Sequence, residues 1–408
     1  MKERRWLIMA LPLFLAIFID GMGMGILFPI LTAIIADRSH SILASGTPIN
    51  IRNLLYGITI AAFSLAWFIG APILSDLSDR TGRKKPLVFS LFGTCIGYIL
   101  SIIAVAYRSI SLLIIGRLIA GFTAGSQPIA QAAIIDLSTP ENRTRNLGYI
   151  LLSVSLGFVV GPLVGAFLSD SQLVSWFDYT TPFYFAALVS FLNALFIGIY
   201  FKETFKTSGI SKIRFGRALE LFADAFRNKN IRYLSTAFLF LQLAWGAYFS
   251  FSSLFLHAKF NYNTQEIGFY ITLMAIGFGL GFAYIVNFVA HRFMLKNTVM
   301  VSAFLVGIFI LMTTYINTPI YVWIIVAFLG MSMAVAFSST ITLYSNQVDE
   351  TQQGWAMGIS NAVGAASFGI ATLFAGFIAE IGLTTTLTLA AAFALISSVL
   401  ISFFPQKK

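Results

Sequence analysis

The sequence predicts an all-α membrane protein whose twelve transmembrane helices form two pseudo-symmetric bundles of six. Three observations lead to this fold class. Hydrophobic residues make up 58% of the 408 positions and charged residues only 10%, whereas about 25% of the residues of a soluble domain are charged. Apolar stretches long enough to cross a bilayer recur along the chain. One long polar segment divides these stretches into two sets of six.

The composition also limits the classes of function. So few charges could not cover the surface of a soluble fold of this size, so the chain must be solvated by lipid. The net charge of +10 does not indicate nucleic-acid binding, because the basic residues lie in short connections rather than on one face. The single cysteine, Cys95, excludes a disulfide framework and is expected as a buried thiol. The sequence has no metal-ligand spacing, nucleophile–base pattern or phosphate-binding loop, so neither an enzyme nor a cofactor is predicted.

The spans follow from the roughly 20 mainly apolar residues that a helix needs to cross the hydrocarbon layer. The first stretch has a basic start but no cleavage site after it, and it is interpreted as a retained helix rather than a signal peptide. The twelve predicted spans are 6–36, 53–75, 86–107, 110–137, 145–169, 181–201, 233–257, 265–290, 298–316, 319–345, 353–379 and 383–404. The predicted domains are therefore 1–201 and 232–408, joined by a linker at 202–231.

The distribution of Lys and Arg orients these spans. Most of the 26 basic residues lie in segments that share one side of the membrane with both termini, and eight of them are in residues 202–232. Because basic residues accumulate in cytoplasmic segments, both termini are predicted to be cytoplasmic. Part of the linker, residues 214–227, is amphipathic and is expected as a helix on the membrane surface.

Two ionisable residues lie clearly inside the predicted apolar layer. Asp20 is in the first span and Arg117 in the fourth, and at about 1.5 Å rise per residue they fall at similar depth. Either charge alone would be costly in lipid, so each should face the protein interior or a partner. One interpretation is a permanent ion pair between the two residues, or an Asp20 that merely lies near a water-filled opening of the protein. The other is a titrating site in which Asp20 binds and releases a proton while Arg117 stays charged.

A charged segment, SDLSDRTGRKK at residues 75–85, separates the second and third spans. Its Lys84 and Lys85 fit a simple role in orienting the chain. Asp79 does not, because an acid contributes nothing to that orientation. Asp79 is expected to face the N-terminal dipole of the eleventh span, with Arg83 bridging it to Asp136 at the inner end of the fourth span. Such a contact would form a breakable clasp.

The fourth and fifth spans each carry a patterned face. Gln131 and Pro128 lie near the Arg117 side of a helical projection and Gln127 lies somewhat further round. These residues predict a polar cavity wall with a kink, although hydrogen bonds between helices would also explain the two glutamines. In the fifth span, glycines at i, i+4 and i+8 form one ridge for close helix packing. That ridge consists of Gly157, Gly161 and Gly165, with Pro162 beside it.

The second half has no Asp or Arg in the middle of a span and offers amides and aromatic residues instead. Gln242 and Trp245, three positions apart in the seventh span, and Asn361 in the eleventh are the predicted cavity residues. Aromatic residues of membrane helices also serve as core or lipid-facing groups. The connection DLSTPENRTRNLG of the first half is echoed by NQVDETQQGWAMG in the second. Two related bundles around a central path are typical of secondary transporters.

Four stretches resemble the major facilitator superfamily, and within it the twelve-span drug–proton antiporters of the tetracycline-efflux type. The charged segment fits the superfamily motif G-x-L-x-D-R-x-G-R-[RK], with Ser75 replacing the leading glycine. GRLIAGFTAG, at 116–125, supplies the arginine and glycine of the fourth span. GFVVGPLVG, at 157–165, is similar to the G-x-x-x-G-P-x-x-G pattern of antiporters. DGMGMGILFP, at 20–29, matches D-x-x-G-x-G-x-x-x-P of tetracycline exporters.

The resemblance implies roles for these residues. Asp20 and Arg117 would couple transport to protons, and the glycine–proline pattern of the fifth span would seal the protein against leak. A cytoplasmic gate would be formed by Asp79, Arg80, Gly82, Arg83 and Asp136. The implied protein is a monomer of the bacterial inner membrane whose energy source is the proton gradient rather than a cofactor.

Two functions remain open at this point. The first is proton-coupled export of a small amphipathic compound, a drug or metabolite, by alternating access. The second is a carrier of the same fold for an anionic metabolite or siderophore-type solute, in either direction, with Arg117 binding a substrate carboxylate.

Overall fold

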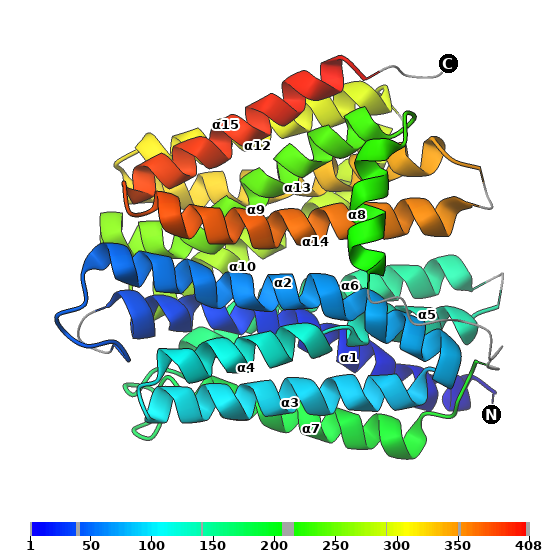
Figure 1. The fold of residues 1–408 in the computed structure, drawn as a ribbon, viewed down its shortest axis with the longest axis horizontal. Coiled ribbons are helices and arrows are strands. Elements are labelled where there is room, and N and C mark those ends of the chain that lie inside the picture. Colours follow the sequence, from blue (N-terminus) through cyan, green and yellow to red (C-terminus); the bar gives the residue numbers. More distant parts are fainter. Residues whose placement is uncertain are drawn as a thin grey trace. The chain divides into compact units, whose positions relative to one another are not determined.

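The computed structural model describes residues 2–37, 41–139, 142–205, 216–290, 292–349 and 352–404. Within these ranges the chain forms α-helices and two short π-helical segments, and no strand (Figure 1). The described residues include twelve helical stretches that are long and apolar enough to cross a membrane. The predicted fold class, all-α with twelve spans, is confirmed.

The first half contains six of these spans. Their elements are α1 (Lys2–Leu31) with η1 (Thr32–Ala36), α2 (Ile49–Thr81), α3 (Lys84–Ala106), α4 (Ile110–Thr123) with α5 (Ser126–Asp136), α6 (Arg143–Phe167) and α7 (Thr181–Tyr200). The second half contains the short helix α8 (Arg217–Arg227) and six further spans. These are α9 (Arg232–Phe260), α10 (Thr264–Leu280) with η2 (Gly281–Ile285) and α11 (Val286–Ala290), α12 (Leu295–Tyr315), α13 (Pro319–Asn346), α14 (Gln353–Ile378) and α15 (Leu383–Ser402).

The second span is longer than the sequence predicted. It was expected over 53–75, but α2 continues through the first part of the charged segment to Thr81. Nothing in residues 75–81 breaks a helix, and the hydroxyl of Ser78 donates back to the carbonyl of Ser75 over 2.8 Å. The helix ends at Gly82, whose φ of 91° suits glycine. The charged segment is therefore half helix and half turn.

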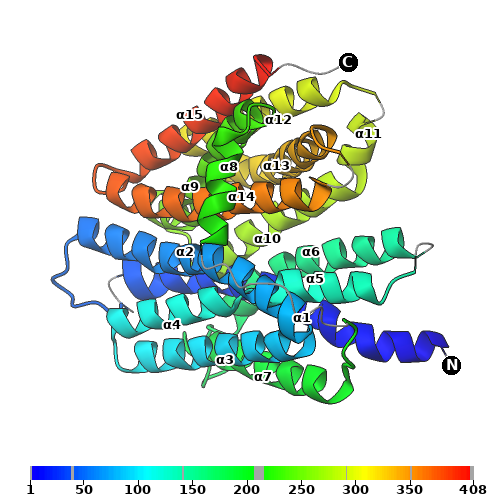
Figure 2. The ribbon, with the colours of Figure 1, turned by 45° about the vertical axis from the view of Figure 1, so that its right-hand side comes forward.

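The chain divides into two compact units. One comprises Met1–Thr47 and Ala62–Arg217, and the other comprises Pro48–Ala61 and Ala218–Lys408. In the first unit, α1 packs against α6, and α3 packs against both α4 and α7. Figures 1 and 2 both show α3 between α4 and α7. In the second unit, α9 and α12 both pack against α15, and α10 packs against α13.

The start of α2 packs within the second unit. The side-chain amide of Asn53 donates to the carbonyl of Ala379 at 3.2 Å, and the hydroxyl of Tyr56 donates to the carbonyl of Ser250 at 2.9 Å. Gly57 and Gly376 let the backbones of α2 and α14 approach closely, because a Cβ on Gly57 would meet the Cα of Gly376 at 2.8 Å. The two halves of α2 thus belong to different units.

The linker contains the amphipathic helix that the sequence predicted. The prediction covered 214–227 and the helix is α8, which crosses α14 in Figures 1 and 2. Its small residues Ala218 and Ala225 are buried, and Leu221 lies beside Gly358 of α14. Residues 206–215 of the predicted linker lie outside the described ranges, as do Lys407 and Lys408, which contributed to the predicted orientation.

The glycine ridge of α6 packs directly on the backbone of α1. A Cβ on Gly157 would overlap the carbonyl of Phe18, and a Cβ on Gly161 would overlap that of Met22. The predicted close-packing role of this ridge is therefore present. Pro162 lies against Gly25 of α1, and α6 runs as one helix through it.

Replacing Gly161 by Ala is expected to lower the melting temperature of the purified protein in detergent. The added methyl group would push α6 away from Met22 in a packed interface, which costs about 1–3 kcal/mol. Gly148 lies on the same helix with nothing within 4 Å of its Cβ position. Gly148→Ala is the matched control and should not lower the melting temperature. Equal losses in the two variants would contradict this account of the ridge.

Candidate functional site

The fourth span is broken in its middle. α4 ends at Thr123 and α5 begins at Ser126, so the helix is interrupted over two residues just before the predicted kink at Pro128. Pro128 explains its position, because proline has no N–H for the carbonyl four residues earlier and its ring collides with that carbonyl. The fourth residue before Pro128 is Ala124, which lies in the break. The N-terminal end of α5 consequently lies buried inside the first unit.

Asp20 of α1 lies at this N-terminal end. The hydroxyl of Ser126 donates to Oδ2 of Asp20 over 2.6 Å, and the backbone N–H of Gln127 also bonds this carboxyl group. Helix N-termini attract negative charge through their free N–H groups and dipole. The second oxygen, Oδ1, is buried and has no hydrogen-bond partner among the described residues. These two donors therefore stabilise the ionised form of Asp20, while Oδ1 has no described hydrogen-bond partner.

Arg117 of α4 is buried but is not paired with Asp20. The described residues provide no carboxylate for its guanidinium, and its Nε has no hydrogen-bond partner among them. The guanidinium instead lies 4.3 Å from the centre of the Phe63 ring. Gly121 makes this possible, because a Cβ there would overlap the backbone of Phe63. The structure thus places the acid and the cation in one region without the direct ion pair considered from the sequence.

Tyr98 of α3 completes this region, and the sequence analysis did not identify it. Its side chain is 3% exposed and interacts electrostatically with both Arg117 and Asp20. Its hydroxyl lies where the Cβ of Gly23 would be, so the glycine of the first span makes room for it. A polar aromatic residue in the middle of a span is the signal that could have found it. Asp20, Tyr98, Arg117 and Ser126 are called the acid site below.

The predicted cavity residues fall in both units. Gln127 and Gln131 are partly exposed on α5, beyond the interruption that follows Arg117's helix α4. In the second unit, Gln242 is buried with its carbonyl oxygen lacking a described partner. Trp245 stacks on Phe278 with centroids 6.0 Å apart. Asn361 is exposed.

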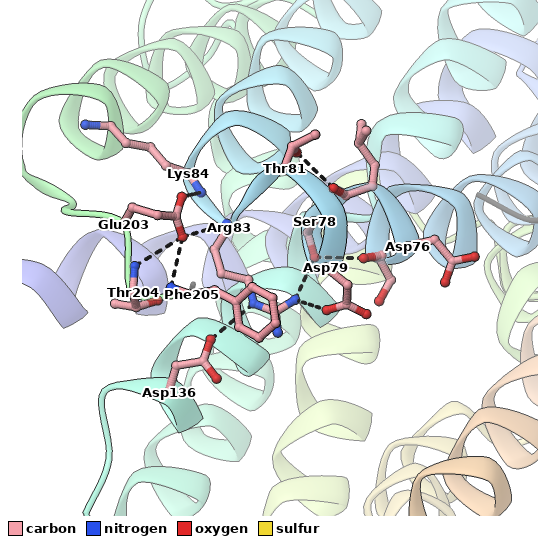
Figure 3. Close-up of polar contacts among 12 residues, drawn as sticks. Asp76, Ser78, Asp79, Thr81, Arg83, Lys84, Asp136, Glu203, Thr204 and Phe205 are labelled. Atoms are coloured by element: carbon pink, nitrogen blue, oxygen red, sulfur yellow. Dashed lines mark hydrogen bonds and ion pairs between the residues drawn. The ribbon is translucent and has the colours of Figure 1, made fainter. Parts of the chain in front are cut away.

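Arg83 is the centre of the charged segment. Its guanidinium donates to Asp79 at 2.5 Å, to Asp136 at 3.1 Å and to the hydroxyl of Ser78 at 2.8 Å (Figure 3). The predicted bridge between Asp79 and Asp136 is therefore present. The Arg83 side chain is only 8% exposed, whereas that of Asp79 is 42% exposed. We call Ser78, Asp79, Arg83 and Asp136 the Arg83 cluster.

Glu203, which follows α7, holds the start of α3 from the other side. Its carboxylate accepts hydrogen bonds from the backbone N–H groups of Arg83 at 2.8 Å and Lys84 at 3.0 Å (Figure 3). Phe205 covers the Arg83 guanidinium with its ring, 4.6 Å away. Gly82 must be glycine here on two counts, since its φ is positive and a Cβ would collide with the Glu203 carboxylate. No local pattern in the sequence links Glu203 to a segment 120 residues earlier.

Glu203 makes stability depend on pH. Burial alone would raise the pKa of Glu203, but hydrogen bonds from the backbone N–H groups of Lys84, Arg83, Phe205 and Thr204 hold that pKa below its usual range. A carboxyl group whose pKa is lower in the folded state stabilises the fold above its unfolded pKa. This stability disappears as the pH falls through the folded pKa.

Glu203→Gln is therefore expected to melt a few degrees below the parent protein at neutral pH, because it loses a charged helix cap. The difference should shrink as the pH falls to about 4 and below. Glu380 is an exposed acid after α14, and Glu380→Gln is the control that should change nothing. A constant difference between Glu203→Gln and the parent at every pH would contradict the role of the charge.

Two other charged residues of this segment, Arg80 and Asp76, lie outside the Arg83 cluster. Arg80 is exposed, and no described residue contacts its side chain through an ion pair or hydrogen bond. Asp76, which is buried, forms an ion pair with Arg217 at the start of α8. The segment therefore holds Arg217 of the linker as well as the Arg83 cluster.

Comparison with known proteins identifies relatives along nearly the whole chain. The class H tetracycline resistance protein of Pasteurella multocida is 26% identical over 341 residues, covering 82% of this chain and 80% of that protein. The quinolone resistance protein NorA of Staphylococcus aureus is 24% identical over 408 residues, covering 97% and 96%. The crystal structure of the human organic anion transporter MFSD10 (TETRAN) superposes with a TM-score of 0.69 at 20% identity, covering 98% and 99% of the two chains.

The sequence model of one family covers most of the chain, from residue 13 to residue 372. The same stretch contains the acid site, the Arg83 cluster and the glycine ridge of α6. With twelve membrane-spanning helices in two units, this chain is a multi-pass membrane protein and belongs to the Major Facilitator Superfamily.

Proposed function

We propose that this protein is a proton-coupled secondary transporter that exports a small amphipathic compound across the bacterial cytoplasmic membrane. The observation that carries the proposal is Asp20, an acid in the middle of a span at the N-terminal end of α5. The relatives support the direction and substrate class, because their names describe resistance to tetracycline and to quinolones. Export of a compound from the cell is the simplest route by which a membrane transporter gives resistance.

The surroundings of Asp20 suit reversible protonation. The hydroxyl of Ser126 and the N-terminal end of α5 favour the carboxylate, whereas the apolar span around it favours the neutral acid. A change in water access would tip this balance in either direction. If the two states of alternating access hydrate Asp20 differently, proton binding on one side and release on the other drive the transport cycle.

The Arg83 cluster is proposed as the cytoplasmic gate. With both termini in the cytoplasm, as the distribution of basic residues predicts, the charged segment lies at the cytoplasmic ends of α2 and α3. Ion pairs at a helix end contribute about 0.3–2 kcal/mol each. Such energies bias a two-state equilibrium without locking it, which is what a gate requires.

Arg117 gives specific support to a second function. Its buried guanidinium has no described carboxylate partner, and a substrate carboxylate would fit it by a charge-assisted hydrogen bond. The protein would then carry an anionic solute. The two functions differ in the charge of the solute that competes for transport.

The test is transport into proteoliposomes under an imposed pH gradient. Tetracycline, a fluoroquinolone, a cationic dye and a small dicarboxylate are the probes, each measured with and without the protonophore that collapses the gradient. Uptake of an amphipathic drug or dye that the protonophore abolishes is the expected result. Preferential transport of the dicarboxylate would favour the second function, and transport that is independent of the gradient would exclude proton coupling.

A further inference from the structure

Tyr98 interacts electrostatically with both buried charges of the acid site. It comes from α3, whereas Asp20 comes from α1 and Arg117 from α4. The tip of its side chain reaches α1 at Gly23, three residues after Asp20, and occupies the place of the Cβ that this glycine lacks. The ring therefore spans from α3 to the α1 segment that carries the acid.

The two charges have reason to pair if nothing prevents it. A carboxylate and a guanidinium in a poorly solvated region attract each other strongly, and arginine can bind a carboxylate through two hydrogen bonds. Yet no ion pair joins Asp20 and Arg117 among the described contacts, and each keeps one buried polar atom without a hydrogen-bond partner there. Tyr98 is the described side chain that interacts with both of them.

No other charged group within the described residues competes for this role. The titratable groups that interact here are Tyr98 with Asp20 and Tyr98 with Arg117. α5 contributes the hydroxyl of Ser126 and α6 contributes its glycine ridge. α7 contributes the ring of Phe183, whose centroid lies 6.4 Å from that of Tyr98.

We infer that Tyr98 is a positioning residue whose ring keeps Arg117 from forming an ion pair with Asp20, so that Asp20 remains free to bind a proton. The inference rests on the proposed function of Asp20. A permanent ion pair would hold the carboxylate ionised, and a proton could then bind only at a much lower pH. The ring acts here through its volume, and its hydroxyl group is not required to exchange a proton.

Two substitutions separate volume from hydroxyl chemistry. Tyr98→Phe keeps the ring and should retain transport within about twofold of the parent with an unchanged pH profile. Tyr98→Leu removes the aromatic ring that keeps Arg117 from Asp20. The pH profile of transport by this variant should shift toward acid by about one pH unit or more, with about a tenfold loss of transport rate at neutral pH. Substrate exchange without a pH gradient should persist in both variants, which shows that they are folded.

A steric test on Gly23 adds a second measurement. Gly23→Ala places a methyl group where the Tyr98 hydroxyl lies, so this variant should lose transport. The double variant Gly23→Ala/Tyr98→Phe removes the overlapping oxygen and should recover a large part of it. Failure of the double variant to exceed Gly23→Ala would overturn the proposed placement of the ring.

Tyr344 provides the matched control. It is a buried tyrosine of α13 whose hydroxyl donates to Ser235 at 2.9 Å. Tyr344→Leu should reduce thermal stability and leave the pH profile in place. The inference is overturned if Tyr98→Leu keeps the parent profile, or if Tyr98→Phe is as impaired as Tyr98→Leu. If Asp20→Asn still transports under the pH gradient, the proposed proton coupling itself fails. The Asp20→Asn variant therefore tests the proposed function separately from the Tyr98 variants.

Discussion

Replacing Asp20 by Asn is expected to reduce transport driven by a pH gradient to the level of liposomes without protein. Asparagine has nearly the same shape and keeps an oxygen for the Ser126 hydroxyl, which donates to Asp20 at 2.6 Å. Unlike aspartate, asparagine cannot bind or release a proton at the pH values of the transport experiment. Exchange of labelled for unlabelled substrate, which needs no net proton movement, should continue. The measurement is uptake with an imposed gradient beside exchange at equal pH.

The control for this experiment is another aspartate outside the spans. Asp170 follows α6, where its carboxylate accepts a hydrogen bond from the backbone N–H of Gln172 at 2.8 Å. Asp170→Asn should transport like the parent protein. Driven transport that survives in Asp20→Asn would remove this acid from the mechanism. Loss of both driven transport and exchange would instead assign Asp20 to substrate binding or to structure.

Replacing Arg83 by Gln is expected to slow turnover by about tenfold or more. Hydrogen bonds to charged groups are worth about 1.5–3 kcal/mol each, and this side chain makes such bonds to both Asp79 and Asp136. Glutamine cannot reach both carboxylates or balance their charge. The state that the Arg83 cluster stabilises would lose population, and the transport cycle would slow. Initial rates in proteoliposomes, at saturating substrate, measure the effect.

Arg80 is the matched control, because it lies three residues earlier in the same segment but is exposed and lacks a described partner. Arg80→Gln should transport within about twofold of the parent, since exposed charges contribute little. The transport rate of Arg83→Lys should fall between those of the parent and Arg83→Gln, because lysine keeps the charge without the planar fork of donors. Equal rates for Arg80→Gln and Arg83→Gln would show that the segment serves only to orient the chain.

The spans and the Arg83 cluster illustrate what could be predicted from the sequence. The spans are set by composition and length, which depend only on local residues. The bridge from Arg83 to Asp79 and Asp136 was predictable because its partners lie at helix ends whose positions the spans already determine. The end of α2 was missed, since a polar segment without a glycine or proline can continue a helix just as it can form a loop. It ends at Gly82, where the backbone conformation changes.

The acid site was predicted only in part. Asp20 and Arg117 were found because buried charges are rare in membrane spans. Their relation was not, because it depends on how the helices that carry them are rotated against their neighbours. Ser126, nine positions after Arg117, begins α5 and donates to Asp20.

The sequence by itself determined that this chain lies in lipid, how many times it can cross the bilayer and which of its charges are buried there. These properties follow from hydrophobicity, which each residue carries independently of its neighbours. Only the tertiary structure decided the partners of those charges, namely Ser126 for Asp20, Phe63 for Arg117, Tyr98 near both and Glu203 for the start of α3. Such contacts join residues on different helices, and they depend on how each helix is rotated, where it is broken and how closely a glycine lets it approach its neighbour.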